Sequence, residues 1–146
     1  MDKPQFMYVV YIATTPENLW NALIDSKMTR QYWQHDNVSD WKAGSTWEHR
    51  QHENEKIDLV GKVVEVAPPR RLVITWALPA DENRAERHSR VTFEIEPYRE
   101  VTRLTVVHDQ LEPGSDMHKG IVDGWPKVLS SLKSLLESGK PLPRLW

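Results

Sequence analysis

The stretch of sequence that decides the fold is IVDGWPKVLSSLKSLLESG, from Ile121 to Gly139. Its large apolar residues recur three or four positions apart, which is the spacing of one face of an amphipathic α-helix. Gly139 follows the last of them and is well placed to end the helix, while Ser115 or Asp116 can cap its beginning. Pro126 removes one helical hydrogen bond, so we expect a kink or a fresh start at that residue. The apolar face comprises Ile121, Trp125, Val128, Leu129, Leu132, Leu135 and Leu136.

The middle of the chain supplies the partner that this helix needs, because one amphipathic helix cannot bury its apolar face alone. From Trp41 onward, apolar and polar residues alternate with the period that is typical of half-buried strands. The prolines at 68 and 69 predict a turn, and the charged segment 78–87 predicts a solvated loop. We expect strands at about 6–13, 45–51, 57–66, 70–76, 91–96 and 102–109. Together they predict a curved antiparallel sheet with one apolar face.

Two short helices are expected between the first strand and the rest of the sheet. Thr14 or Thr15 can cap the first helix, and Pro16 suits its first turn. The second helix should cover about residues 27–33. The order of elements predicts an α+β fold in a single domain over residues 1–146, in which a sheet of about six strands wraps the long C-terminal helix.

The composition is that of an ordinary globular chain and argues against several classes of function. Hydrophobic residues make up 39% of the 146 residues and charged residues 27%. The net charge of -2, from 19 basic and 21 acidic side chains, argues against nucleic-acid binding and against a polybasic membrane anchor. No run approaches the roughly 18 apolar residues of a membrane helix, and the start of the chain does not resemble a signal peptide. We therefore expect a cytoplasmic protein without membrane insertion.

Tryptophan is the unusual feature of the composition, with seven Trp against two Phe and no Cys. Trp20 and Trp125 fall at helical core positions and are expected to pack in the core. Trp33, Trp47 and Trp76 have two open interpretations, as core residues or as the walls of a cavity. A sheet that wraps a helix can leave space between the two, and such a space is a natural ligand site.

Several segments of the chain resemble the START-like, helix-grip superfamily, and in particular its bacterial AHSA-type members, the homologues of the activator of the heat-shock ATPase. The resemblance covers nearly the whole chain in the family order. The segments are YIATTPENLWNAL (11–23), TRQYW (29–33), SDWKAGSTW (39–47), VEVAPPRRLVITW (64–76), SRVTFEIEP (89–97), TRLTVVH (102–108) and GWPKVLSSLKSLLE (124–137).

The resemblance implies a β-α-α-β-β-β-β-β-α order of elements and a deep cavity between the C-terminal helix and the sheet. Members of the wider superfamily bind lipids, hormones, polyketides or other apolar molecules, and a few catalyse cyclisation. The eukaryotic activators that name the family stimulate a chaperone ATPase and carry an additional N-terminal domain. The resemblance therefore implies either a small-molecule site or a chaperone partner.

Two histidines are candidates for chemistry in such a cavity. His49 should share the inward face of Trp47, and His108 should share the face of Leu104 and Val106. They could anchor a ligand or act as general acid and base, or they could be hydrogen-bonded core residues. His52 lies on the opposite face from His49, so their spacing does not favour a metal site.

The leading interpretation is a non-enzymatic binder of a small apolar or amphipathic molecule, with no cofactor and no metal. The alternatives are a cyclase- or hydrolase-like enzyme that uses His49 or His108 as general base, and a chaperone co-factor. A homodimer is one expected assembly, with Leu145 and Trp146 docking on a neighbouring subunit or closing the cavity. The expected ligand-binding residues are Trp33, Trp47, His49, Trp76, Phe93, Val106, His108, Met117 and Ile121.

Overall fold

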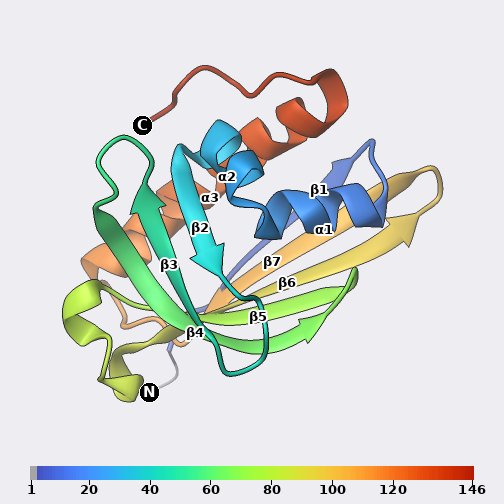
Figure 1. The fold of residues 1–146 in the computed structure, drawn as a ribbon. Helices are drawn as coiled ribbons and strands as arrows, with labels where there is room; N and C mark the ends of the chain where they lie inside the picture. Colours follow the sequence, from blue (N-terminus) through green and yellow to red (C-terminus); the bar gives the residue numbers. More distant parts are fainter. Residues whose placement is uncertain (1–2) are drawn as a thin grey trace.

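The computed structural model describes residues 3–146 and shows seven strands, three α-helices and two short 3-10 helices in this range (Figure 1). The strands are β1 (Phe6–Ile12), β2 (His35–Ser39), β3 (Thr46–Gln51), β4 (Ile57–Ala67), β5 (Arg71–Trp76), β6 (Ser89–Tyr98) and β7 (Val101–Asp109). The α-helices are α1 (Pro16–Ile24), α2 (Ser26–Trp33) and α3 (Asp116–Ser138). The segment predicted to be a solvated loop holds the 3-10 helices η1 (Pro79–Asp81) and η2 (Ala85–Arg87). No helix of residues 3–146 is long and apolar enough to cross a membrane.

All seven strands form one antiparallel sheet in the order β1-β7-β6-β5-β4-β3-β2. The sheet curves beneath the three helices, which lie together on its concave side (Figure 1). The predicted α+β helix-grip fold is therefore confirmed. The sheet has one strand more than the six expected, because β2 pairs with β3 through a register that places Asn37 opposite His49.

The long helix α3 has the boundaries and caps that its sequence predicts. Ser115 Oγ accepts a hydrogen bond of 3.0 Å from the backbone N–H of His118, and Gly139 ends the helix with a φ of +82°. Pro126 lies inside one continuous helix, so the alternative of a fresh start there is wrong. The missing N–H leaves only the carbonyl of Val122 without its helical partner, and Val122 is an exposed residue.

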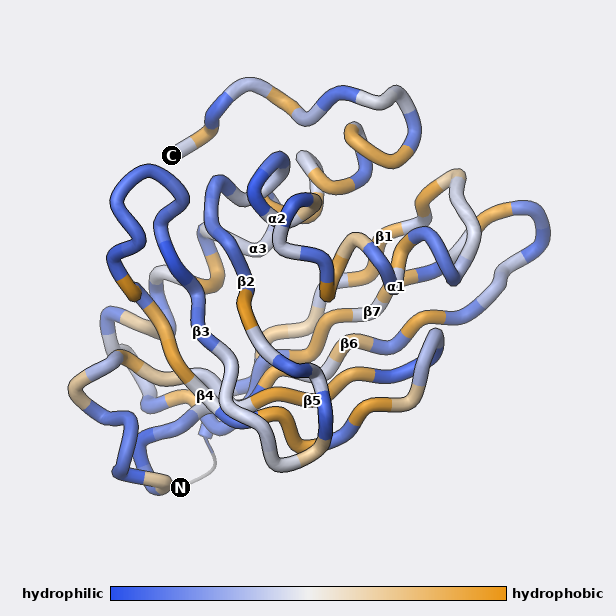
Figure 2. The backbone as a smooth tube through the Cα atoms, in the orientation of Figure 1, coloured by the Kyte–Doolittle hydropathy of each residue, from blue (hydrophilic) through white to orange (hydrophobic). Residues whose placement is uncertain are grey.

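The core fills the space between α3 and the sheet. Figure 2 shows hydrophobic residues along the inner strands and α3, whereas the tip of the β3–β4 hairpin is hydrophilic. The apolar face predicted for α3 is buried from Ile121 to Leu135, and Leu136 is partly buried against the same cluster. Leu19, Trp20 and Leu23 of α1 are buried as well, as the predicted stripe of the first helix requires.

Some element boundaries differ from the predictions for local reasons. Strand β6 continues through Pro97 to Tyr98, so the turn into β7 is shorter than expected and uses Arg99 with a φ of +54°. Pro97 tolerates the strand position near its end, where the ladder is about to stop. The helix α2 begins at Ser26, and Asp25 caps it by accepting a hydrogen bond from the backbone of Lys27.

Candidate functional site

An apolar pocket of about 210 Å³ lies between the N-terminal half of α3 and the concave side of the sheet. Gly120 on the α3 side is exposed, whereas His49 on the sheet side is only 3% exposed, so the pocket runs from the surface into the interior. No Lys, Arg, Asp or Glu lines it. The lining residues are Trp33, His49, Leu59 and Trp76 from α2 and the sheet, and Met117, Gly120, Ile121, Gly124, Trp125 and Val128 from α3.

Five of the nine residues expected at the ligand site line this pocket, and the other four do not. The lining five are Trp33, His49, Trp76, Met117 and Ile121. The remaining four, Trp47, Phe93, Val106 and His108, are buried elsewhere in the core. All nine lie on the inner side of the fold, but the sequence alone does not distinguish residues packed beneath α3 from those that face the remaining space.

Trp47 shows why an inward tryptophan need not face the pocket. Its indole N–H donates a hydrogen bond of 2.7 Å to the carbonyl of Thr75, across strand β4. Gly61 makes this path available, because a Cβ on Gly61 would lie 2.4 Å from the indole nitrogen of Trp47. Phe93 packs edge-on against Trp125, with the ring centroids 5.9 Å apart. These residues support the pocket wall from behind.

Sequence reasoning missed several residues that shape the pocket. Trp125 was expected to be a core residue only, yet it forms part of the wall. Gly120 and Gly124 lie one helical turn apart on α3, and a Cβ at either position would meet no atom within 4 Å. Two glycines one turn apart inside an amphipathic helix could have indicated the pocket from the sequence. Glycine lowers the stability of a helix, so its presence suggests that a side chain at that position would occupy needed space. Leu59 and Val128 gave no such signal.

Three indoles form the aromatic wall of the pocket. Trp33 stacks on Trp76 with centroids 6.1 Å apart and an interplanar angle of 26°. Trp125 contacts both, at centroid distances of 5.4 Å and 5.5 Å. The indole N–H of Trp76 points to the sulfur of Met117 at 3.2 Å, which links β5 to the first turn of α3. Trp125 is tilted by 57° and 45° to the other two rings, so only Trp33 and Trp76 are nearly parallel. The wall is polarizable and is fixed by contacts between different elements.

His49 is the polar group of the pocket, and its hydrogen bond to Asn37 defines its chemical form. Its Nδ1 contacts the side-chain oxygen of Asn37, which can only accept, so Nδ1 carries the hydrogen. Burial lowers the pKa of His49 well below its ordinary value, and the neighbouring His35 lowers it further. His49 is thus a neutral imidazole, and its Nε2 bears a lone pair.

His35 from the missed strand β2 stacks face to face on His49, with ring centroids 3.9 Å apart and an interplanar angle of 6°. Its Nε2 lies 2.8 Å from a carboxylate oxygen of Asp58, and its Nδ1 lies 3.0 Å from the carbonyl of Trp33. Both partners are acceptors, so both bonds form when the ring carries two hydrogens. Burial opposes ionisation of Asp58, but hydrogen bonds from His35 and Gln51 lower the pKa of its carboxyl overall.

His108 has a different environment and does not reach the pocket. Its Nδ1 accepts a hydrogen bond of 3.0 Å from the indole N–H of Trp125, and its Nε2 lies 2.8 Å from Ser89 Oγ. Ser89 donates its own hydrogen to the carbonyl of Trp76, so it accepts from His108. Burial lowers the pKa of His108 to about 3. Both ring nitrogens of His108 are engaged, and the ring holds the indole of Trp125 in place.

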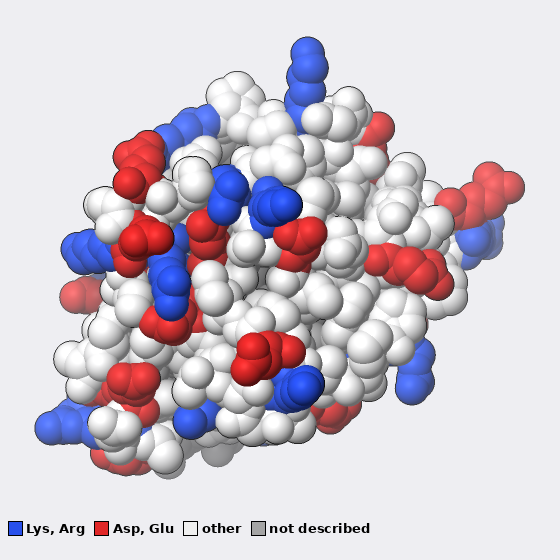
Figure 3. Space-filling view, in the orientation of Figure 1, with Lys and Arg blue, Asp and Glu red and all other residues white. Residues whose placement is uncertain are grey.

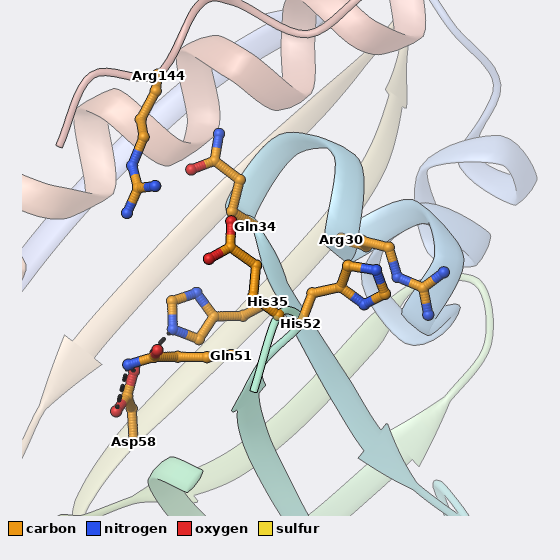
Figure 4. A pocket seen from close by; sticks show the side chains of 8 residues that line it. Arg30, Gln34, His35, Gln51, His52, Asp58 and Arg144 are labelled. Atoms are coloured by element: carbon orange, nitrogen blue, oxygen red, sulfur yellow. Dashed lines mark hydrogen bonds and ion pairs between the residues drawn. The ribbon is translucent and has the colours of Figure 1, made fainter. Parts of the chain in front are cut away.

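A second, polar cleft of about 490 Å³ is lined by His35 (Figure 4), whose ring stacks on that of His49. Arg144 reaches toward it from the C-terminal segment, which runs past α2 (Figure 4). The cleft lies beside the β3–β4 hairpin. On the face of the molecule drawn in Figure 3, acidic and basic side chains are mixed and form no patch of one sign. Its lining residues are Arg30, Gln34, His35, Gln51, His52, Glu53, Asp58 and Arg144. His35 thus belongs to the polar cleft and His49 to the apolar pocket.

A curved antiparallel sheet closed by a long C-terminal helix, with two short helices after the first strand, is the helix-grip fold of START-like proteins. Residues 13–137 match the family described as activator of Hsp90 ATPase homolog 1-like proteins, and the chain belongs to this family. The family resemblance drawn from the sequence is therefore confirmed. No curated protein matches the chain.

Three solved structures with the same fold are similar to this chain over nearly their whole length. The Aha1 dimer from Colwellia psychrerythraea superposes with a TM-score of 0.78 at 22% identity, covering 94% of this chain and 98% of that chain. A protein from Mesorhizobium loti gives a TM-score of 0.77 at 24% identity, covering 91% and 96%. An Hsp90 activator from Plasmodium falciparum gives a TM-score of 0.72 at 23% identity, covering 90% and 95%. At these identities the likeness concerns the fold alone.

Proposed function

We propose that this protein binds a small, largely apolar molecule in the pocket between α3 and the sheet. The observation that carries the proposal is the pocket itself, about 210 Å³ in volume and without a single charged side chain in its lining. An engineered apolar protein cavity of about 150 Å³ is large enough to bind benzene. The pocket is thus of a size to take a molecule of one or two rings.

The two glycines of α3 support the same proposal. Gly120 and Gly124 both line the pocket, and the space in front of them is open. Each glycine inside a helix costs about 1 kcal/mol relative to alanine. Two glycines lower the stability of a helix that serves only to pack the core. In a binding site, the absence of their side chains leaves an opening through which a ligand can enter.

The proposal is tested by calorimetric titration of the full chain with 2-methoxynaphthalene, a neutral two-ring probe. We expect saturable binding that is lost in Gly124→Leu, because the leucine side chain fills the open space beside the pocket. Val122→Leu is the matched control, since Val122 lies on α3 with 45% of its surface exposed. Absence of binding to the unmodified chain, or equal binding by Gly124→Leu, would contradict the proposal.

A second candidate function is contact with a protein partner, which one observation favours. Strand β1 is an edge of the sheet and exposes Met7, Val9 and Tyr11 by 60%, 43% and 42%. Exposed apolar residues on an edge strand are a common site of association between chains. One solved structure of the same fold is an Hsp90 activator and another is a dimer, so a chaperone or a second copy would be the partner.

A further inference from the structure

We propose that the ligand of the apolar pocket is an uncharged, flat molecule of one or two rings whose hydroxyl or N–H group donates a hydrogen bond to Nε2 of His49. This inference rests on the proposed function and specifies the chemical class of its ligand. It is carried by the state of one buried atom, by the charges absent from the pocket lining and by the shape of the aromatic wall.

The buried atom is Nε2 of His49. His49 is 3% exposed and lines the pocket, yet its Nε2 has no hydrogen-bond partner among residues 3–146. Within residues 3–146, the side-chain nitrogen and oxygen atoms that have no partner and that solvent cannot reach belong to Gln34, Arg50 and Arg103. His49 Nε2 has no partner but is not one of these atoms, so solvent can reach it through the pocket that His49 lines. A ligand that fills the pocket displaces water from this atom, and leaving the atom unpaired is costly, so a ligand that supplies the partner binds more tightly than one that does not.

The partner must be a hydrogen-bond donor. Asn37 holds the hydrogen of His49 on Nδ1, so Nε2 can only accept while the ring is neutral. A carboxylate or ether oxygen offers another lone pair to Nε2 and gains nothing. A hydroxyl or N–H group offers the hydrogen that this atom lacks.

The ligand must also be uncharged. The ten lining residues include no Lys, Arg, Asp or Glu, so an ionic group would lose its hydration without finding an opposite charge. An anion could pair with His49 only if that ring became cationic. Burial opposes the cation, and so does His35, which is stacked on the ring and hydrogen-bonded to Asp58.

The shape of the ligand follows from the tryptophans. Trp33 and Trp76 present rings inclined by only 26° to each other, and His49 lies edge-on to Trp33 at a centroid distance of 4.7 Å. A flat ring can pack against the edge of this near-parallel pair while a substituent on the ring reaches the imidazole. The volume of about 210 Å³ limits the ring system to one or two rings.

The test compares three probes that share one naphthalene ring system, by calorimetry at pH 7.5. They are 2-naphthol, which donates a hydrogen bond; 2-methoxynaphthalene, which does not; and 2-naphthoate, which is an anion. We expect 2-naphthol to bind about tenfold more tightly than 2-methoxynaphthalene, which corresponds to one buried hydrogen bond of about 1.4 kcal/mol. We expect no measurable binding of 2-naphthoate. In His49→Phe, 2-naphthol should lose its higher affinity while 2-methoxynaphthalene still binds. The control is His52→Phe, which changes a residue of the polar cleft and none of the apolar pocket, and it should leave the affinities unchanged.

A second measurement does not depend on the folding of the variant. In the unmodified chain, the ¹⁵N resonance of His49 Nε2 should have the shift of an unprotonated ring nitrogen and should move upfield when 2-naphthol is added. Equal affinities for 2-naphthol and 2-methoxynaphthalene, tighter binding of 2-naphthoate, or an Nε2 that already carries a hydrogen would overturn this inference and leave the proposed function standing. If 2-methoxynaphthalene does not bind to the unmodified chain, the proposed function fails together with it.

Discussion

His49 and His108 project from different strands to the same side of the sheet, and their partners give them different chemistry. Both nitrogens of His108 are engaged, by Trp125 and by Ser89, so the ring fixes the position of an indole. Only one nitrogen of His49 is engaged, by Asn37, so the other remains available. The chemical role of each histidine thus depends on which of its ring nitrogens find partners on other elements.

The two histidines also predict how stability changes with pH. The pKa of both rings is lowered in the folded state, to about 3 for His108 and well below 6.5 for His49. Below pH 6.5 the unfolded chain therefore binds protons that the folded chain does not, and the free energy of unfolding falls as the pH is lowered. We expect a decrease of about 1.4 kcal/mol per pH unit for each ring between pH 6 and pH 5.

Urea denaturation at pH 7.0, 6.0 and 5.0 measures this decrease before most carboxylates titrate. In His108→Gln, the amide can accept from Trp125 and donate to Ser89, so the variant should fold and should lose about half of the pH dependence. A free energy of unfolding that stays constant from pH 7.0 to pH 5.0 would show that neither ring is held neutral in the folded state.

At the scale of elements, α3 serves two purposes along its length. Its C-terminal half contributes Leu129 and Leu132, which are almost completely buried against the sheet. Its N-terminal half carries Gly120 and Gly124, with Ile121 and Trp125 between and beside them, and stands over the pocket. The C-terminal half of α3 therefore packs tightly on the sheet, whereas its N-terminal half leaves the pocket open to the surface.

This division predicts that helix stability and ligand binding change in opposite directions. The double variant Gly120→Ala/Gly124→Ala should raise the free energy of unfolding by about 1–2 kcal/mol, because alanine is the better helix former and meets no atom within 4 Å. The added methyl groups narrow the entrance, so the affinity for 2-methoxynaphthalene should fall several-fold.

Val122→Ala provides the comparison on the exposed side of the same helix. It should increase helix propensity with no change in affinity for the probe. Urea denaturation and calorimetry on the same samples give both quantities. A double glycine variant that gains stability and retains full affinity would show that the glycines do not form the entrance.

At the scale of the whole molecule, the apolar pocket is lined by His49 and the polar cleft by His35, and the rings of these two residues stack on each other. Leu145 and Trp146 do not line the apolar pocket, whereas Arg144 lines the polar cleft. The expectation that the last two residues close the ligand cavity is therefore wrong. Both side chains are exposed, by 42% and 41%.

The edge strand β1 leads to a prediction about assembly. If its exposed apolar residues hold a partner chain, Val9→Lys should abolish that association, because a lysine on an edge strand discourages pairing with another chain. Sedimentation of the purified protein measures the homodimer, and stimulation of a chaperone ATPase measures the other partner. Val122→Lys, an exposed apolar residue on α3, is the control. Unchanged sedimentation and unchanged stimulation in Val9→Lys would exclude β1 as the contact.

The elements that the sequence predicted well are those in which one short pattern fixes the structure. The apolar spacing from Ile121 to Leu136 and the caps Ser115 and Gly139 define α3 almost to the residue. Strand β2 escaped prediction because HDNVS has no apolar alternation, and its inward residue is the polar Asn37. Its place in the sheet depends on pairing with β3 and on His35 and Asn37 meeting partners from other elements.

By itself, the sequence predicted the order of the elements and most of the residues that face inward, because periodicity and caps act over a few neighbouring positions. Its resemblance to known segments indicated the helix-grip fold and the family. Only the tertiary structure decided which inward residues face open space, since Trp47 and Trp76 share the same pattern and differ in what lies in front of them. It also decided that His49 keeps a free lone pair while His108 does not. The physical reason is that space and hydrogen-bond partners are contributed by residues distant in the chain, and no local pattern specifies them.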